Sequence, residues 1–244
     1  NVVCDFYRDN PRYWEEWEYG GKGRQLCLAH QAVRDHKIAI LVEAAKYGLD
    51  GLCLGFLRHM PVVQYAKIAR DAYKRKFGKE PPRNPKHPDA HHLTSLPERG
   101  DKEYVRWWQF RAGYLTQFGR ELRHALQKNG LTHVKVAIWV RPNNCLFDGI
   151  DMDAWLNEGL CDDVVTQEGP GQGKRLDLCW EQPEWKKMVR SKVPLIRGIP
   201  MWVKKARPMV KRILREGCDG ICTYESDYTV LDTRFIDLYR SLRK

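Results

Sequence analysis

The sequence lacks three patterns that would assign a chemistry directly. Its eight cysteines are scattered without a CxxC pair, so the spacing of zinc ribbons and thioredoxin-like redox sites is absent. No GxGxxG or GxxxxGK[ST] run follows a predicted strand, which argues against a dinucleotide or P-loop site. No apolar run approaches the roughly 20 residues that cross a bilayer. We therefore expect no metal, no cofactor and no membrane span.

Composition and charge restrict the class of protein further. The chain has 244 residues, 43% of them hydrophobic, which suits one large globular domain or two small ones. Lysine and arginine number 42 against 31 acids, a formal charge of +11. This balance favours an acidic partner such as nucleic acid, anionic membrane or acidic polysaccharide, or simply gives a basic solvated surface. For nucleic acid, the sequence offers no RRM, KH or zinc-finger signature.

Helix and strand patterns alternate along most of the chain. Helical periodicity predicts helices over 30–47, 62–77 and 102–128. Short apolar runs predict strands over 50–56, 134–140, 163–166, 193–196 and 220–224. The last four strands begin about 30 residues apart, the length of a strand–helix–strand unit. We expect an α/β fold with a parallel sheet covered on both faces, and a barrel rather than an open sheet.

Two features stand apart from this alternation. The stretch 79–101 holds five prolines and three histidines and is predicted to be an irregular insertion. Its histidines lack the spacing of a metal site. Cys53, Cys218 and Cys222 lie in apolar strand-like runs, where we expect them to be buried as small hydrophobes. The aromatic pair Trp107 and Trp108 lies in the long helix pattern, so at least one of them should be core.

Four segments together resemble one family. They are Leu28–Arg34 (LAHQAVR), Tyr47–Pro61 (YGLDGLCLGFLRHMP), Val105–Arg123 (VRWWQFRAGYLTQFGRELR) and Gly149–Asp162 (GIDMDAWLNEGLCD). In this order they resemble the glycoside-hydrolase-like, family-ten-like TIM-barrel proteins, a mostly uncharacterised group, over about residues 25 to 228. The resemblance implies that 1–244 is the C-terminal portion of a single (β/α)8 domain, covering about strands four to eight. The first three strands would lie upstream of Asn1, and secretion or a periplasmic location is implied.

One position departs from the family pattern. The family's strand motif commonly ends Asp-Gly-x-x-Leu-Asp-Phe, with an acid at the carboxyl end of the strand, whereas this chain has Gly55 there. Asp50 matches the first Asp of the motif, but it opens the strand at the opposite face of a barrel, where residues serve stability.

The candidate catalytic residues are acids that follow predicted strands, because TIM-barrel active sites lie at that face. Glu225 directly follows the strand 220–224 and is the first candidate, with Glu168 in a glycine-rich loop as its partner. Asp148 and Asp227 are placed lower, as acceptors for sugar hydroxyls or as caps. Each of the four has an alternative role as a structural or solvated loop acid.

The candidate substrate-binding residues follow the same strand ends. An indole beside amide and guanidinium groups suits a pyranose ring, although a strand tryptophan can equally belong to the core. The predicted set is Arg58, His59, Trp139, Arg141, Asn143, Tyr224 and Asp227, with Asn144 beside them.

The sequence therefore favours a hydrolase of O-glycosidic bonds in a neutral or acidic polysaccharide or oligosaccharide. Glu225 and Glu168 are its predicted acid/base pair. The first alternative is a non-catalytic carbohydrate-binding barrel that has lost the acid at Gly55. The second is a basic nucleic-acid-binding protein.

Overall fold

The structure is a computed structural model. It describes residues 4–18, 20–56, 62–83, 102–142, 145–167, 183–200, 210–211, 213, 215 and 217–224. The helices are α1 (Asp5–Asp9), η1 (Pro11–Tyr13), α2 (Gln31–Ala45), α3 (Lys67–Phe77), α4 (Lys102–Lys128), α5 (Cys145–Asp148), α6 (Met152–Asn157) and α8 (Pro183–Arg190). The strands are β1 (Trp14–Glu16), β2 (Lys22–Leu26), β3 (Gly51–Gly55), β4 (Lys135–Val140), β5 (Asp163–Gln167), β6 (Leu195–Pro200) and β7 (Gly220–Tyr224).

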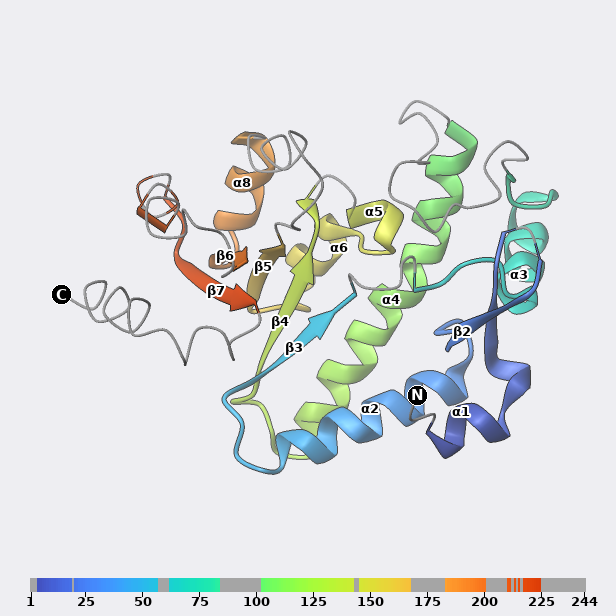
Figure 1. The fold of residues 1–244 in the computed structure, drawn as a ribbon, viewed down its shortest axis with the longest axis horizontal. Coiled ribbons are helices and arrows are strands. Elements are labelled where there is room, and N and C mark those ends of the chain that lie inside the picture. The colour runs from blue at the N-terminus through green and yellow to red at the C-terminus, as the bar shows by residue number, and fades with distance from the viewer. Residues whose placement is uncertain are drawn as a thin grey trace.

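The main sheet has five strands in chain order, β3-β4-β5-β6-β7, and every neighbouring pair is parallel (Figure 1). This confirms the predicted α/β fold and its five strands. Each strand follows the last through a crossover that holds helical turns, the usual way of joining parallel strands. Among the described residues the sheet ends at β3 and β7 and does not close into a barrel.

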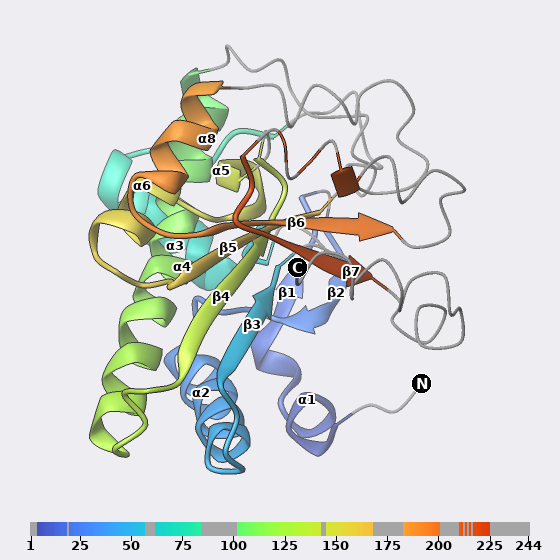
Figure 2. The ribbon, with the colours of Figure 1, turned by 90° about the vertical axis from the view of Figure 1, so that its left-hand side faces the viewer.

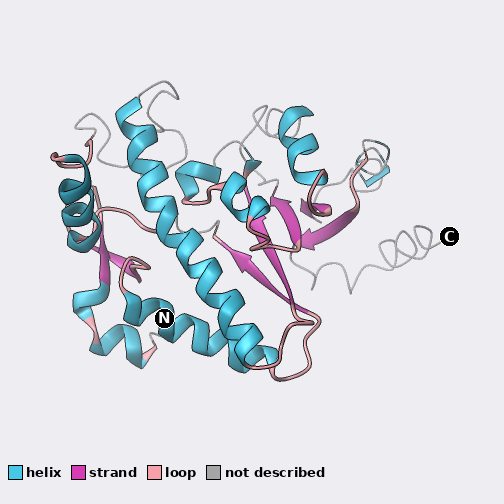
Figure 3. Cartoon of the chain, turned by 180° about the vertical axis from the view of Figure 1, so that it is seen from behind, coloured by secondary structure: helices cyan, strands magenta, loops and turns pink. Residues whose placement is uncertain are grey.

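One face of the sheet carries the hydrophobic core. Figure 3, the view from behind, shows α4 and α6 lying in front of the strands on this side, which we call the outer face. Successive residues of a strand point to opposite sides. On β3 and β4 the outer face holds buried Leu52, Leu54, Val136, Ile138 and Val140. In the same core, Trp107 of α4 is fully buried and Trp108 nearly so, as predicted.

The opposite, inner face is covered unevenly, so the expectation of cover on both faces is wrong at its first strand. On β3, Gly51, Cys53 and Gly55 are exposed, which also corrects the expected burial of Cys53. On β4, Trp139 is half-buried, and on β5, Val165 is buried. Burial that rises from the edge strand towards the middle strands is typical of a curled sheet, whose central strands lie at the bottom of a trough.

The direction of the strands agrees with a strongly twisted and curled sheet. Figure 2 shows β6 and β7 crossing the direction of β3 and β4 at a wide angle. Neighbouring strands rotate by about 20 to 25° each in ordinary sheets, so a large angle accumulates over five strands.

Two element boundaries differ from the predicted ones. The helix predicted to begin at residue 62 begins at Lys67, because the chain before it is tied to β1. The Tyr65 N–H donates to the Glu16 carbonyl (3.0 Å), and the Ala66 N–H donates to Glu15 Oε1 (2.7 Å). The strand predicted at 193–196 begins at Leu195, since the Val193 N–H still bonds to the Val189 carbonyl at the end of α8 (3.0 Å).

The sequence pattern did not predict the hairpin of β1 and β2. These strands pair antiparallel, and the turn between them contains Gly20 and Gly21 at φ of 94° and 82°. Such left-handed conformations suit glycine, which has no Cβ to clash. The hairpin lies beside α3 and away from the main sheet (Figure 1). It forms the wall of a cavity described below.

Candidate functional site

The carboxyl ends of the five parallel strands form a common edge, where ligands of α/β proteins bind. Trp139 lies on the inner face of β4 next to this edge, and its register partner on β3 is Gly55. A Cβ atom added to Gly55 would meet no heavy atom within 4 Å. The structure therefore places open space beside a half-buried indole at this edge.

An ion pair joins the end of β4 to α5 next to this edge. Arg141 follows the end of β4, and its Nε donates to Asp148 Oδ2 at 2.9 Å while its Nη2 donates to Asp148 Oδ1. Asp148 belongs to α5 and is fully buried. Burial raises the pKa of Asp148 to about 7, an effect that the positive charges of Arg141 and Arg111 oppose. Both carboxylate oxygens are engaged, so Asp148 fixes Arg141 and is not an open acceptor for a sugar.

Arg111 is a buried cation that the sequence analysis did not single out. It comes from α4, and its Nη2 donates to the Phe147 carbonyl at 2.6 Å, one residue before Asp148. Burial lowers the pKa of Arg111 to about 10, and nearby acidic groups, first Tyr65 and then Asp148, oppose that shift. Arg111 thus connects the long helix to α5 and positions the acid that holds Arg141. The feature of the sequence that could have identified Arg111 is its place beside Trp107, Trp108 and Ala112, on an otherwise apolar face of the predicted helix.

Most predicted site residues fall outside the part of the chain that the structure describes. This applies to Glu225, Glu168, Arg58, His59, Asn143 and Asp227. In the chain, Glu168 and Glu225 come directly after Gln167 and Tyr224, the last residues of β5 and β7. The Tyr224 backbone pairs with Pro200 of β6 at the same edge. Their assigned roles therefore remain predictions.

Two thiols lie on the inner face of the edge strands, Cys53 on β3 and Cys222 on β7. Partial desolvation raises the pKa of the Cys53 thiol although its surface is exposed, and the charge of Cys222 raises it further.

Within the described ranges, no group of three or more metal-ligating side chains comes together, and none of the helices is long and apolar enough to cross a membrane. The described cysteines form no disulfide with one another. No protein-family model matches this chain, and no curated protein matches it either. The strand edge and the resemblance of the four segments are therefore the two features that bear on function.

Proposed function

We propose that this chain forms about strands four to eight of a (β/α)8 barrel that binds a carbohydrate at the carboxyl edge of its strands and hydrolyses an O-glycosidic bond. The observation that carries the proposal is the curled sheet of five parallel strands in chain order, with open space and an indole at its carboxyl edge. Barrel enzymes place their active sites at this edge. The resemblance to glycoside-hydrolase-like proteins supplies the substrate class.

In this proposal Trp139 gives the apolar platform for a pyranose ring, and the space in front of Gly55 receives the sugar. Arg141, held by Asp148, contributes a fixed positive charge beside the platform. Asn143 follows on the same strand end, and the other predicted binders are Arg58, His59, Tyr224 and Asp227. Together they would donate and accept hydrogen bonds with the sugar hydroxyls.

Glu225 and Glu168 are the proposed acid/base pair. One protonates the leaving glycosidic oxygen while the other attacks the anomeric carbon or activates a water molecule there. A separation of about 5 to 5.5 Å between the carboxyl groups gives retention, and about 6.5 to 9.5 Å gives inversion. Asp148 does not serve in this pair, because Arg141 occupies both of its oxygens.

The test is reducing-sugar release across a panel of neutral and acidic polysaccharides, with the melting temperature measured for each. Glu225→Gln and Glu168→Gln should each lower the rate by at least about 100-fold, the usual effect of losing an acid/base group. The matched control is Glu158→Gln, because Glu158 is an acid paired with Arg120 on the exposed surface. Unchanged release in Glu225→Gln would remove that residue from the reaction.

A second candidate function is carbohydrate binding without hydrolysis, and Gly55 favours it. The family commonly has an acid at this place, and here the side chain is absent. Because a Cβ at Gly55 meets no heavy atom within 4 Å, Gly55→Asp should fold and place a carboxylate at the strand edge. A higher rate of release in Gly55→Asp would identify a decayed enzyme. Stabilisation of the unaltered protein by a polysaccharide, without release, would identify a binding protein.

A further inference from the structure

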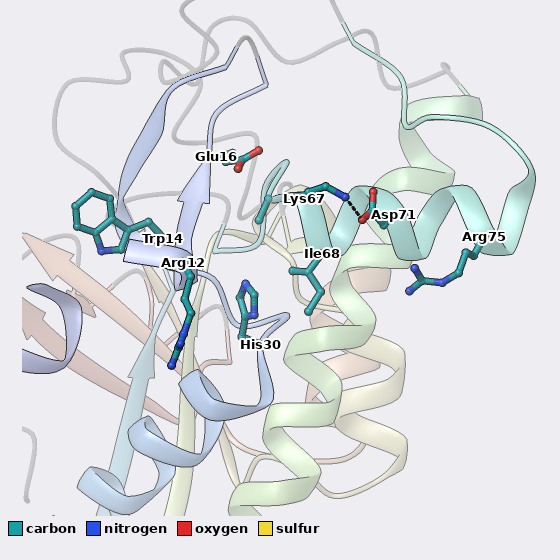
Figure 4. Close-up of a pocket in the computed structure, with 9 residues that line it drawn as sticks. Arg12, Trp14, Glu16, His30, Lys67, Ile68, Asp71 and Arg75 are labelled. Atoms are coloured by element: carbon teal, nitrogen blue, oxygen red, sulfur yellow. Dashed lines mark hydrogen bonds and ion pairs between the residues drawn. The ribbon is translucent and has the colours of Figure 1, made fainter. Parts of the chain in front are cut away.

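A cavity of about 320 Å³ lies away from the strand edge, between the β1–β2 hairpin, the start of α2 and the side of α3 from Lys67 to Arg75 (Figure 4). None of the predicted site residues lines it. Its volume is at the lower end of the range for small-molecule sites. The residues that matter for its chemistry are Arg12, Trp14, His30, Ile68, Asp71 and Arg75.

An apolar wall is built into this cavity. Trp14 lines it from β1, while the next residue, Glu15, is buried in the core, as strand alternation requires. The indole is fixed, because Trp14 Nε1 donates to the Tyr7 carbonyl at 2.8 Å and the two rings stack at 4.8 Å. Ile68 contributes further apolar surface from the first turn of α3. In Figure 4 the Trp14 indole turns away from Ile68, so Ile68 gives the apolar surface that lies between His30 and Arg75.

The charges around the cavity leave it positive. Its two acids are already neutralised, since Glu16 receives Lys22 at 2.8 Å and Arg70 at 3.0 Å, and Asp71 receives Lys67 at 2.5 Å.

Two arginines are not neutralised in this way. Arg12 contacts only neutral groups among the described residues, namely the Asn10 side-chain oxygen and the Tyr13 ring. Arg75 forms no hydrogen bond or ion pair within the part of the chain that the structure describes. Figure 4 shows Arg12 and Arg75 on different sides of the cavity, with His30 and Ile68 between them.

The pKa of His30 reports whether an anion is bound in the cavity. Its ring lies against that of Tyr13, with centroids 4.9 Å apart. Burial lowers the pKa of His30, and the charges of Arg12 and Arg34 lower it further. The imidazole is therefore neutral at pH 7 while the cavity is empty of anions. A bound carboxylate would offset the positive charges and raise the His30 pKa.

We propose that this cavity binds an acidic sugar unit, such as a uronic acid, with its ring on Ile68 and its carboxylate paired with Arg75. The inference rests on the proposed function and deepens it, because it makes an acidic polysaccharide the substrate class. A uronate carboxylate forms charge-assisted hydrogen bonds with guanidinium groups, which are stronger than neutral ones. The overall charge of +11 favours the same kind of polymer.

Calorimetric titration of the full chain with glucuronic acid, glucose and inorganic phosphate tests this proposal. Glucuronic acid should bind at least about tenfold more tightly than glucose, and Arg75→Gln should weaken it by about tenfold. Lys74→Gln is the matched control, since it removes one charge from the same helix without lining the cavity, and it should change little. In parallel, NMR titration should show the His30 pKa rising when glucuronic acid binds.

Equal affinity for glucose and glucuronic acid, or equal losses in Arg75→Gln and Lys74→Gln, would overturn the proposal. Phosphate binding as tightly as glucuronic acid would reduce the cavity to a simple anion site and would also overturn it. The proposed function fails separately. If glucuronic acid binding depends on Arg75 but no polysaccharide releases reducing sugar, the cavity proposal stands and the proposed hydrolysis is wrong. If neutral polysaccharides are hydrolysed at the same rate by Arg75→Gln, the proposed hydrolysis stands and the cavity proposal is wrong.

Discussion

The outer and inner faces of the same sheet are built from different residues. On β3, the outer face carries buried Leu52 and Leu54, while the inner face carries Gly51, Cys53 and Gly55, all exposed. Large branched side chains fill the space between sheet and helices. Small side chains on the other side leave room beside Trp139. The contrast indicates that the outer face stabilises the fold and that the inner face is available to a ligand.

The largest expected difference between the two faces is in the free energy of unfolding that is lost when a side chain is shortened. Ile138 is fully buried on the outer face, so Ile138→Ala should lower the free energy of unfolding by about 2 to 5 kcal/mol. Cys53→Ala removes one exposed atom from the inner face and should change it by less than about 0.5 kcal/mol. Urea denaturation monitored by tryptophan fluorescence measures both. Similar losses in the two variants would contradict the division between the faces.

A smaller effect tests how tightly the outer face is packed. Gly119 lies on α4, where an added Cβ would come within 3.2 Å of the Trp155 ring on α6 and 3.3 Å of Leu160. We expect Gly119→Ala to cost about 1 to 3 kcal/mol through this crowding. On the same helix Gly113 has open space, so Gly113→Ala should stabilise by about 0.5 to 1 kcal/mol. If Gly119→Ala were also stabilising, α4 and α6 would not be in close contact.

A pH-dependent effect concerns the carboxyl edge of the strands. Burial raises the folded-state pKa of Asp148 from 3.8 to about 7, so the carboxylate that pairs with Arg141 takes up a proton on acidification at a pH where the unfolded chain is still ionised. This contribution to stability is full below about pH 4 and is lost as the pH rises through about 7. Asp148→Asn should therefore flatten the fall of the melting temperature over that range. Parallel curves for the two proteins would show that Asp148 is ionised throughout.

Local patterns in the sequence were enough for much of the fold. The bounds of α4 agree with the predicted 102–128, since a long amphipathic period leaves little freedom. The five parallel strands follow from apolar runs spaced by helices. The start of α3 was not predictable in this way, because it depends on Glu15, which is 51 residues distant from Ala66. The exposure of Cys53 was missed because an apolar run does not reveal which of its faces is covered.

Less of the candidate site than of the fold could be predicted from the sequence. Strand ends identified where side chains would gather, and Trp139 does lie on the inner face at that edge. The pairing of Arg141 with Asp148 depends on a short helix seven residues later folding back over the strand end. The role of Arg111 depends on α4 packing against α5. Such contacts between elements leave no periodic signal in a single sequence.

Filling the space at Gly55 tests whether the carbohydrate binds at the carboxyl edge of the sheet. Gly55→Leu should fold, because nothing lies within 4 Å of the added Cβ, and should lower both polysaccharide-induced stabilisation and reducing-sugar release by at least about tenfold. Gly113→Leu, on the exposed side of α4, is the control and should keep both. If Gly55→Leu matches the unaltered protein in binding and release, the carbohydrate does not occupy the inner edge of the sheet.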